Sequence, residues 1–131
     1  MNQNLRTRGE MERSLSQHIQ AFYRNQLGCR VGKISSYILD DRVAISVEDS
    51  ITPLEKLLDN AEDLQLRRDL RDRIDDIVKQ ELMSSIEKIL GVQAIDLAIN
   101  TTLDQNLTGM MVFLSDTPTY RRTKCPSRTR N

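Results

Sequence analysis

The sequence has few of the residues from which catalytic and metal sites are built. Its 131 residues include no tryptophan, one histidine and two cysteines, and only 4% are aromatic. The single histidine, His18, excludes most acid–base and metal chemistry that depends on several histidines. Cys29 and Cys125 lie far apart, so neither a disulfide framework nor a structural zinc site is expected. We therefore expect a protein that holds no metal ion or cofactor and is not an enzyme.

Long apolar runs are absent as well. The longest, Met110 to Leu114, is far shorter than the roughly 20 residues that a transmembrane helix needs. Residues 1–20 lack the basic and then apolar order of a secretory signal. The sequence therefore predicts a cytoplasmic protein without a transmembrane segment.

Positive charge is concentrated at the C-terminus, although the formal net charge is zero. Residues 117–131 carry five basic and no acidic side chains, which leaves 14 basic against 19 acidic residues in 1–116. Since residues 117–131 have almost nothing to bury, we expect a disordered basic tail. The remainder divides into a flexible leader (1–8) and a single domain (9–116).

Two long helices are predicted from apolar residues that recur every three to five positions. The first runs from Gly9 to Leu27 and the second from about Asp63 to Leu90, and a glycine suited to a left-handed cap follows each. The stripe of the second comprises Leu70, Ile74, Ile77, Val78, Leu82, Ile86, Ile89 and Leu90.

A short helix is predicted between the two long ones. Thr52-Pro53-Leu54-Glu55 is a helix start in which the threonine and the glutamate cap each other and proline occupies the first turn. The helix is expected to extend to about Asn60. We expect three leucines to turn inward: Leu54, Leu57 and Leu58.

Four strands are predicted in two hairpins. Residues 33–39 and 42–48 flank the turn Asp40-Asp41, and Val92–Ile99 and Thr108–Leu114 flank a polar connection, Asn100–Leu107. The order helix, Leu-Gly, strand, turn, strand, Asp therefore occurs twice. It predicts an α+β fold of order α-β-β-α-α-β-β, with a four-stranded antiparallel sheet and the helices on one face.

The apolar pattern of the last predicted strand indicates an interaction surface. Met110 to Leu114 are apolar at both alternating sets of positions, which is typical of a strand buried on both faces. Because helices on one side leave the other side of the sheet uncovered, we expect a partner chain there and favour a homodimer. The predicted contact residues are Met110, Val112 and Leu114.

The charged face of the second long helix is another candidate surface. Four pairs of opposite charge lie four residues apart: Asp63–Arg67, Arg68–Asp72, Asp69–Arg73 and Arg71–Asp75. Each such pair stabilises a helix by roughly 0.2–0.5 kcal/mol, which favours a solvated helix face. The alternative interpretation is a docking surface for another protein, with Arg67 and Arg71 as its contacts.

Few other residues suggest chemistry. His18 lies beside the apolar stripe of the first helix, which favours a boundary position. Cys29 follows that helix, whose negative C-terminal end opposes thiolate formation, so we expect an inert thiol. The acidic pairs Asp40-Asp41 and Glu48-Asp49 lack the alternating spacing and the glycine of a calcium loop.

Several motifs, spread over about residues 6–116, carry a resemblance to a known family. They are Gly9-Glu10-Met11-Glu12, Leu27-Gly28, Asp49-Ser50-Ile51-Thr52-Pro53-Leu54-Glu55-Lys56-Leu57-Leu58 and Ile89-Leu90-Gly91-Val92. Together they resemble the MpsC family, a small bacterial domain family. After the first helix this family often has a Gly-Arg-Gly-Pro-like run, where this chain has Gly28-Cys29-Arg30-Val31. The resemblance implies an accessory role in a Na+-translocating, membrane-potential-generating system tied to bicarbonate uptake, and it implies no catalytic residues.

The sequence thus favours a non-enzymatic, homodimeric protein-interaction module, and the resemblance implies a membrane-transport protein as a candidate partner. One alternative is a sensor of a small anion or nucleotide, bound at the loops Gly28–Lys33 and Asn100–Thr108. Another is nucleic-acid binding through the basic tail, which lacks an aromatic platform beyond Tyr120.

Overall fold

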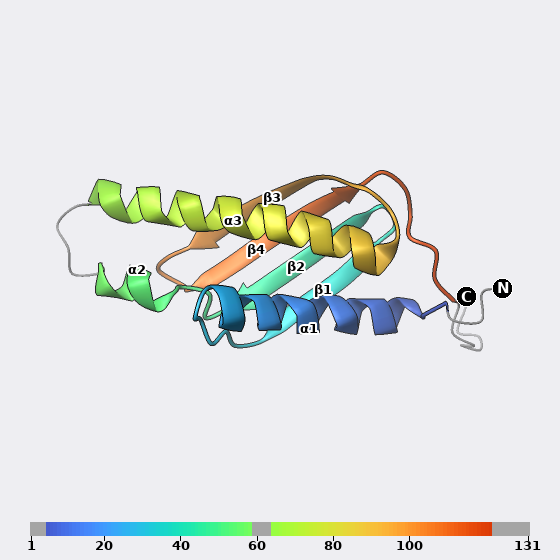
Figure 1. Ribbon diagram of the computed structural model, residues 1–131, viewed down its shortest axis with the longest axis horizontal. Coiled ribbons are helices and arrows are strands. Elements are labelled where there is room, and N and C mark those ends of the chain that lie inside the picture. Colours follow the sequence, from blue (N-terminus) through green and yellow to red (C-terminus); the bar gives the residue numbers. More distant parts are fainter. Residues whose placement is uncertain (1–4, 59–63, 122–131) are drawn as a thin grey trace.

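The computed structural model describes residues 5–58 and 64–121, which form three helices and one four-stranded sheet (Figure 1). The elements are α1 (Arg8–Gln26), β1 (Ile34–Leu39), β2 (Arg42–Glu48), α2 (Pro53–Leu57), α3 (Leu64–Leu90), β3 (Ala94–Thr102) and β4 (Leu107–Leu114). Their order is the predicted α-β-β-α-α-β-β. The α+β prediction is therefore confirmed.

Local capping interactions set where the helices begin and end. Thr52 and Glu55 form the predicted capping box at the start of α2. Thr7 and Glu10 form a second capping box at the start of α1, which the sequence analysis missed. Gly28 and Gly91 follow α1 and α3 with φ angles of 61° and 74°, the left-handed conformation that glycine adopts most cheaply.

The sheet is antiparallel throughout, in the strand order β1-β2-β4-β3. The turn at Asp40-Asp41 joins β1 to β2 as predicted, and Asp40 has a φ of 56°. The second hairpin is longer than predicted, because β3 extends to Thr102 and β4 starts at Leu107. Half of the expected polar connection Asn100–Leu107 is therefore strand, since its threonines pair across the ladder, and residues 103–106 form the turn.

All three helices of the described chain lie on one face of the sheet, as predicted (Figure 1). α1 packs on the β1 side and α3 on the β3 side, and the core lies between these helices and the sheet. Most of the predicted α3 stripe is buried or half-buried there. Ile77 is the exception, because it lies on the outer side of α3 and is 52% exposed.

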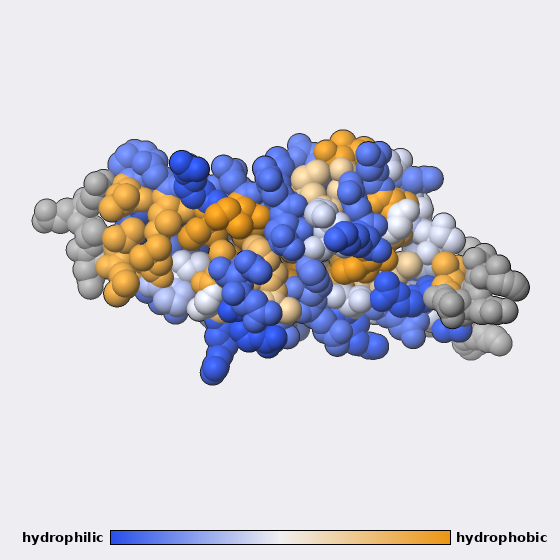
Figure 2. Space-filling model, in the orientation of Figure 1, coloured by the Kyte–Doolittle hydropathy of each residue, from blue (hydrophilic) through white to orange (hydrophobic). Residues whose placement is uncertain are grey.

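The prediction for α2 is wrong about which side chains face inward. Leu54 is 54% exposed and Leu57 is 78% exposed, and Leu58 is half-buried. The inward position is taken by Glu55, which is 6% exposed and is bound by Arg71. Figure 2 accordingly shows hydrophobic surface at the α2 end of the helical side of the molecule.

The predicted leader and tail lie partly outside the described residues. Within the described part, the N-terminal and C-terminal segments meet: the Arg121 N–H donates to the Arg6 carbonyl at 2.7 Å. Cys125 and the remaining basic residues of the tail are outside the described residues.

Candidate functional site

The face of the sheet opposite the helices carries an apolar row that crosses all four strands. In register order this row is Tyr37, Ala44, Met111 and Ala98. The adjacent row contains Leu39, Arg42 and Phe113. We call the surface formed by these two rows the open face.

The large apolar side chains of the open face are exposed to solvent to a high degree. Tyr37 is 56% exposed and Leu39 is 53% exposed, while Met111 and Phe113 are half-buried. The Arg42 guanidinium lies 5.4 Å from the centre of the Phe113 ring, a cation–π contact. Toward the other end of the strands the same face becomes polar, with Ser35, Ser46, Gly109 and Asn100 in one row.

The predicted contact residues of β4 point the other way. Met110, Val112 and Leu114 are 5%, 0% and 3% exposed because they pack under the helices. β4 is therefore not buried on both faces within one chain, and the residues that reach the open face are Met111 and Phe113. Tyr37 and Leu39 were also missed, although their alternation with the buried Ser36 and Ile38 gives the signal.

Arg71, predicted as a surface contact, is instead the centre of a buried polar cluster. It is 6% exposed, and its Nε and Nη2 donate to the two carboxylate oxygens of Glu55, with Nε–Oε2 at 2.7 Å. Its Nη1 donates to Asp75 Oδ1 at 3.1 Å. Burial raises the pKa of Asp75, and Arg71 acts against this shift.

The four pairs of opposite charge that the sequence predicts on the second long helix have different outcomes in the structure. Arg71–Asp75 is formed, whereas Arg68–Asp72 and Asp69–Arg73 are not ion pairs in the described chain. Asp63 lies outside the described residues, and Arg67 is half-buried on α3.

Hydroxyl groups extend the polar cluster toward the sheet. Arg71 Nη1 lies 3.4 Å from Thr101 Oγ1, Thr101 lies 2.7 Å from Thr108 Oγ1, and Thr108 lies 2.6 Å from Ser50 Oγ. Tyr23 adjoins the cluster and is fully buried, and its hydroxyl finds no hydrogen-bond partner among the described residues. Burial raises the pKa of Tyr23 well above its ordinary value. The cluster satisfies its own charges, which suits a structural role.

A family model described as "Na+-translocating membrane potential-generating system (MpsC)" matches residues 7–116. The chain belongs to the MpsC family. No curated protein and no solved structure shows significant similarity to it.

The family match spans the whole structural unit of this MpsC chain. It starts at Thr7, the N-cap of α1, and ends at Asp116, two residues after β4. It therefore includes the open face and the Arg71 cluster and excludes the basic tail.

The remaining predicted site residues of this MpsC chain are dispersed. His18 is half-buried on α1, and its Nε2 has no partner among the described residues. Cys29 is buried, its Sγ lies 3.5 Å from the Asp49 and Ile51 carbonyls, and burial raises its pKa, which opposes thiolate formation. Within residues 5–58 and 64–121, no group of three or more potential ligands is placed to hold a metal ion.

The two loops predicted to bind a small anion lie at the same end of the sheet. Asp49 connects them, because its N–H donates to the Asn106 carbonyl at 2.9 Å while its carbonyl contacts Cys29. Asn106 Oδ1 also accepts from the Ile51 N–H. Anion binding there stays a prediction.

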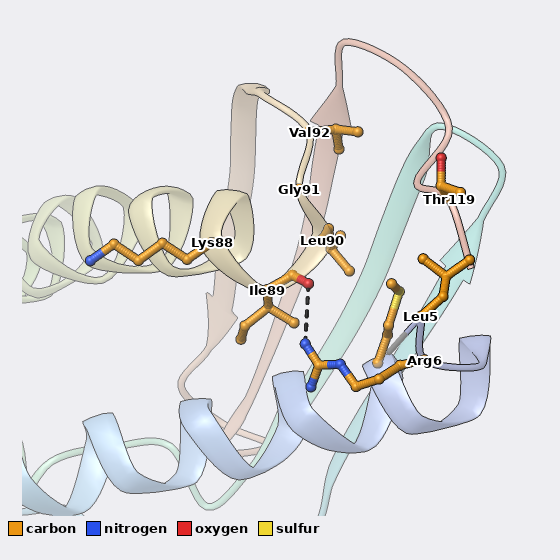
Figure 3. Close-up of a pocket in the computed structure, with 9 residues that line it drawn as sticks. Leu5, Arg6, Lys88, Ile89, Leu90, Gly91, Val92 and Thr119 are labelled. Carbon is orange, nitrogen blue, oxygen red and sulfur yellow. Dashed lines mark hydrogen bonds between the residues drawn. The ribbon is translucent and has the colours of Figure 1, made fainter. Parts of the chain in front are cut away.

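A cavity of about 320 Å³ lies where the N-terminal segment meets the end of α3 (Figure 3). Arg6 donates to the Ile89 carbonyl at 3.3 Å and to Ser14 Oγ at 2.9 Å. Lys88 points away from Arg6 along α3 (Figure 3). Arg6 therefore joins the N-terminal segment to the last turn of α3, where the helix dipole favours a cation.

No helix in the described part of the chain could cross a membrane. Neither long helix combines the necessary length with sufficient apolar character, and the same holds for α2.

Proposed function

We propose that this MpsC-family protein is a non-catalytic interaction module that pairs with a second copy of itself through the open face. The observation that carries the proposal is the one-sided covering of the sheet. Tyr37, Leu39, Met111 and Phe113 form a contiguous apolar surface on the uncovered side. Such surfaces are uncommon on monomers and favour association, because their burial removes apolar area from water.

The charges on the open face support a second copy as the occupant. Along β2, the residues that reach this face are Arg42, Ala44, Ser46 and Glu48, so a cation and an anion flank two small side chains. A two-fold axis that lies between two stacked sheets and crosses the strands would place Arg42 of one copy near Glu48 of the other. An isologous dimer needs this kind of self-complementary surface.

The family match supports a proposal for the cellular role. Its description names a Na+-translocating membrane potential-generating system, and we propose that this chain is a cytoplasmic accessory component of such a system. A non-catalytic role is supported by the chemistry of the described residues. Their most buried carboxylate, Glu55, is bound by Arg71, and their buried thiol, Cys29, has a raised pKa.

Sedimentation velocity and light scattering test the dimer. At tens of micromolar, the wild-type protein is expected at twice its 15.1 kDa chain mass. Met111→Glu, and separately Ala98→Lys on the same row, should produce folded monomers, because each places a charge within the interface. Gln80→Glu on the outer side of α3 is the control and should remain dimeric. A monomeric wild-type protein at these concentrations would refute the proposed interface.

The cellular role needs a separate experiment. In cells that lack this chain, the Na+-dependent part of the membrane potential should fall. Wild-type protein should restore it, and Met111→Glu should restore it less well at equal abundance. An unchanged potential in the deletion strain would exclude the accessory role without affecting the dimer.

A further inference from the structure

A polar groove runs between α1 and residues 29–34, away from the open face. It consists of two neighbouring hollows, of about 270 Å³ and 140 Å³, which have Gln20 as a common lining residue. On the α1 side, Arg13, Gln17, Gln20 and Arg24 recur at helical spacing and so form one stripe. We call this feature the α1 groove.

The α1 groove is basic. Arg13, Arg24 and Arg30 line it and are exposed, whereas no acidic side chain is among its lining residues. Within the described part of the chain, none of these three arginines forms an ion pair with a carboxylate. One carboxylate, that of Asp49, does approach the groove: its Oδ2 would lie 2.6 Å from a Cβ added at Gly32, a lining residue. The groove therefore presents three arginines to an incoming anion.

One wall of the α1 groove is the free edge of the sheet. β1 pairs only with β2, so its outer edge carries unpaired backbone groups. The Ile38 N–H on this edge is already bound by Glu12 Oε2 at 2.8 Å. In an antiparallel ladder, alternate residues point their N–H and C=O groups the same way, so Ile34 and Ser36 also face outward. Ser36 is buried, with its hydroxyl bonded to Ser16 Oγ at 2.9 Å, so the accessible edge lies at Ile34, which lines the groove and has no backbone partner on its outer side in the described chain.

We propose that the α1 groove binds an extended acidic segment of a partner protein, anchored by a main-chain contact to the edge of β1. The backbone of the segment pairs with β1 at Ile34, and its carboxylates reach Arg13, Arg24 and Arg30. Ser36 is buried and Glu12 binds the Ile38 N–H, so main-chain pairing is confined to Ile34. Main-chain pairing supplies affinity in this mode of recognition, and the flanking side chains supply specificity.

The features of the groove favour a peptide over a nucleic acid. A nucleic-acid strand would gain nothing from the free β1 edge, and no aromatic side chain lines the groove for base stacking. Arginine binds carboxylates through paired, charge-assisted hydrogen bonds, which suits an acidic peptide.

Selection from a random decapeptide library tests the proposal on the full-length protein. Selected peptides are expected to be rich in Asp, Glu and β-branched residues. Their binding, measured by fluorescence anisotropy, should weaken about tenfold or more in Arg13→Glu with Arg30→Glu. A peptide with N-methylated backbone amides should also lose binding, because it cannot pair with β1.

The control variant is Arg68→Glu with Arg73→Glu, which changes the net charge equally on exposed positions of α3. It should bind as the wild type does, and both double variants should unfold at similar temperatures. Selected peptides without acidic residues, binding unchanged in the groove variant, or tighter binding of a thymidine decanucleotide would each overturn the proposal. Dimerisation should be unaffected by the groove variant. A negative result for peptide binding would therefore leave the proposed dimer untouched, and a negative result for the dimer would leave peptide binding untouched.

Discussion

Arg71 of α3 holds Glu55 of α2 through a bidentate ion pair with both side chains removed from water. The two side chains are 8% and 6% exposed, and the Arg71 Nε–Glu55 Oε2 distance is 2.7 Å. Leu54 and Leu57 of α2 face solvent, so this one-turn helix is held chiefly by a charged contact. Such a contact is costly to break on one side only, because the remaining charge stays buried.

Arg71→Met should therefore destabilise the protein by about 3–5 kcal/mol, measured by urea unfolding. The loss comes from the unpaired Glu55 carboxylate rather than from packing. Adding Glu55→Leu should recover part of it, because it removes the unpaired charge but also ends the capping box with Thr52. Arg68→Met, at an exposed position on α3, is the control and should stay within about 0.5 kcal/mol of wild type. A loss below about 1 kcal/mol for Arg71→Met would contradict the role assigned to the pair.

Tyr23→Phe should leave stability unchanged or increase it by about 1 kcal/mol. The hydroxyl is fully buried and has no hydrogen-bond partner among the described residues, so its removal ends a desolvation cost. Tyr23→Ala should cost about 3–5 kcal/mol, because it leaves a cavity in the core. Thermal and urea unfolding of both variants give the comparison. A clear loss in Tyr23→Phe would mean that the hydroxyl has a bonding partner such as a bound water.

Tyr23 should also ionise later than an ordinary tyrosine. Burial raises its pKa, while nearby Arg71 acts in the opposite direction. Since the folded pKa exceeds the unfolded one, the stability linked to Tyr23 is complete below about pH 10 and is lost as pH rises through the folded pKa. In Tyr37→Phe with Tyr120→Phe, the phenolate absorbance should rise only together with the loss of helical circular dichroism. A rise near pH 10 with the helices intact would be inconsistent with the buried position.

Leu57→Ser should have little effect on stability, within about 0.5 kcal/mol, because Leu57 is 78% exposed. Leu82→Ala should cost about 2–5 kcal/mol, because Leu82 is fully buried in the core under α3. Urea unfolding of the two variants measures both losses. It therefore distinguishes an exposed Leu57, as the structure has it, from the inward-facing Leu57 that the sequence predicted. A large loss in Leu57→Ser would favour that expectation.

The sequence by itself determined the elements and their order, because the signals for them are local. Thr52 and Glu55 cap a helix whatever lies around it, and Gly28 and Gly91 end helices because they tolerate a positive φ. The repeated helix–strand–strand order then left few ways to bury the apolar stripes. The four-stranded sheet with helices on one face followed from that constraint.

Only the tertiary structure decided which side of each helix or strand is buried in the core and which faces solvent. In β4, apolar residues occupy both sides, so periodicity could not distinguish the buried Met110 from the open-face Met111. The sequence placed Arg71 on a solvated helix face, since an i,i+4 pair with Asp75 has the same pattern there as in a buried cluster. Its burial depends on Glu55, 16 residues away, and the α1 groove likewise depends on how α1 packs against the edge of β1. Contacts between distant segments are set by the packing of whole elements, which no local pattern encodes.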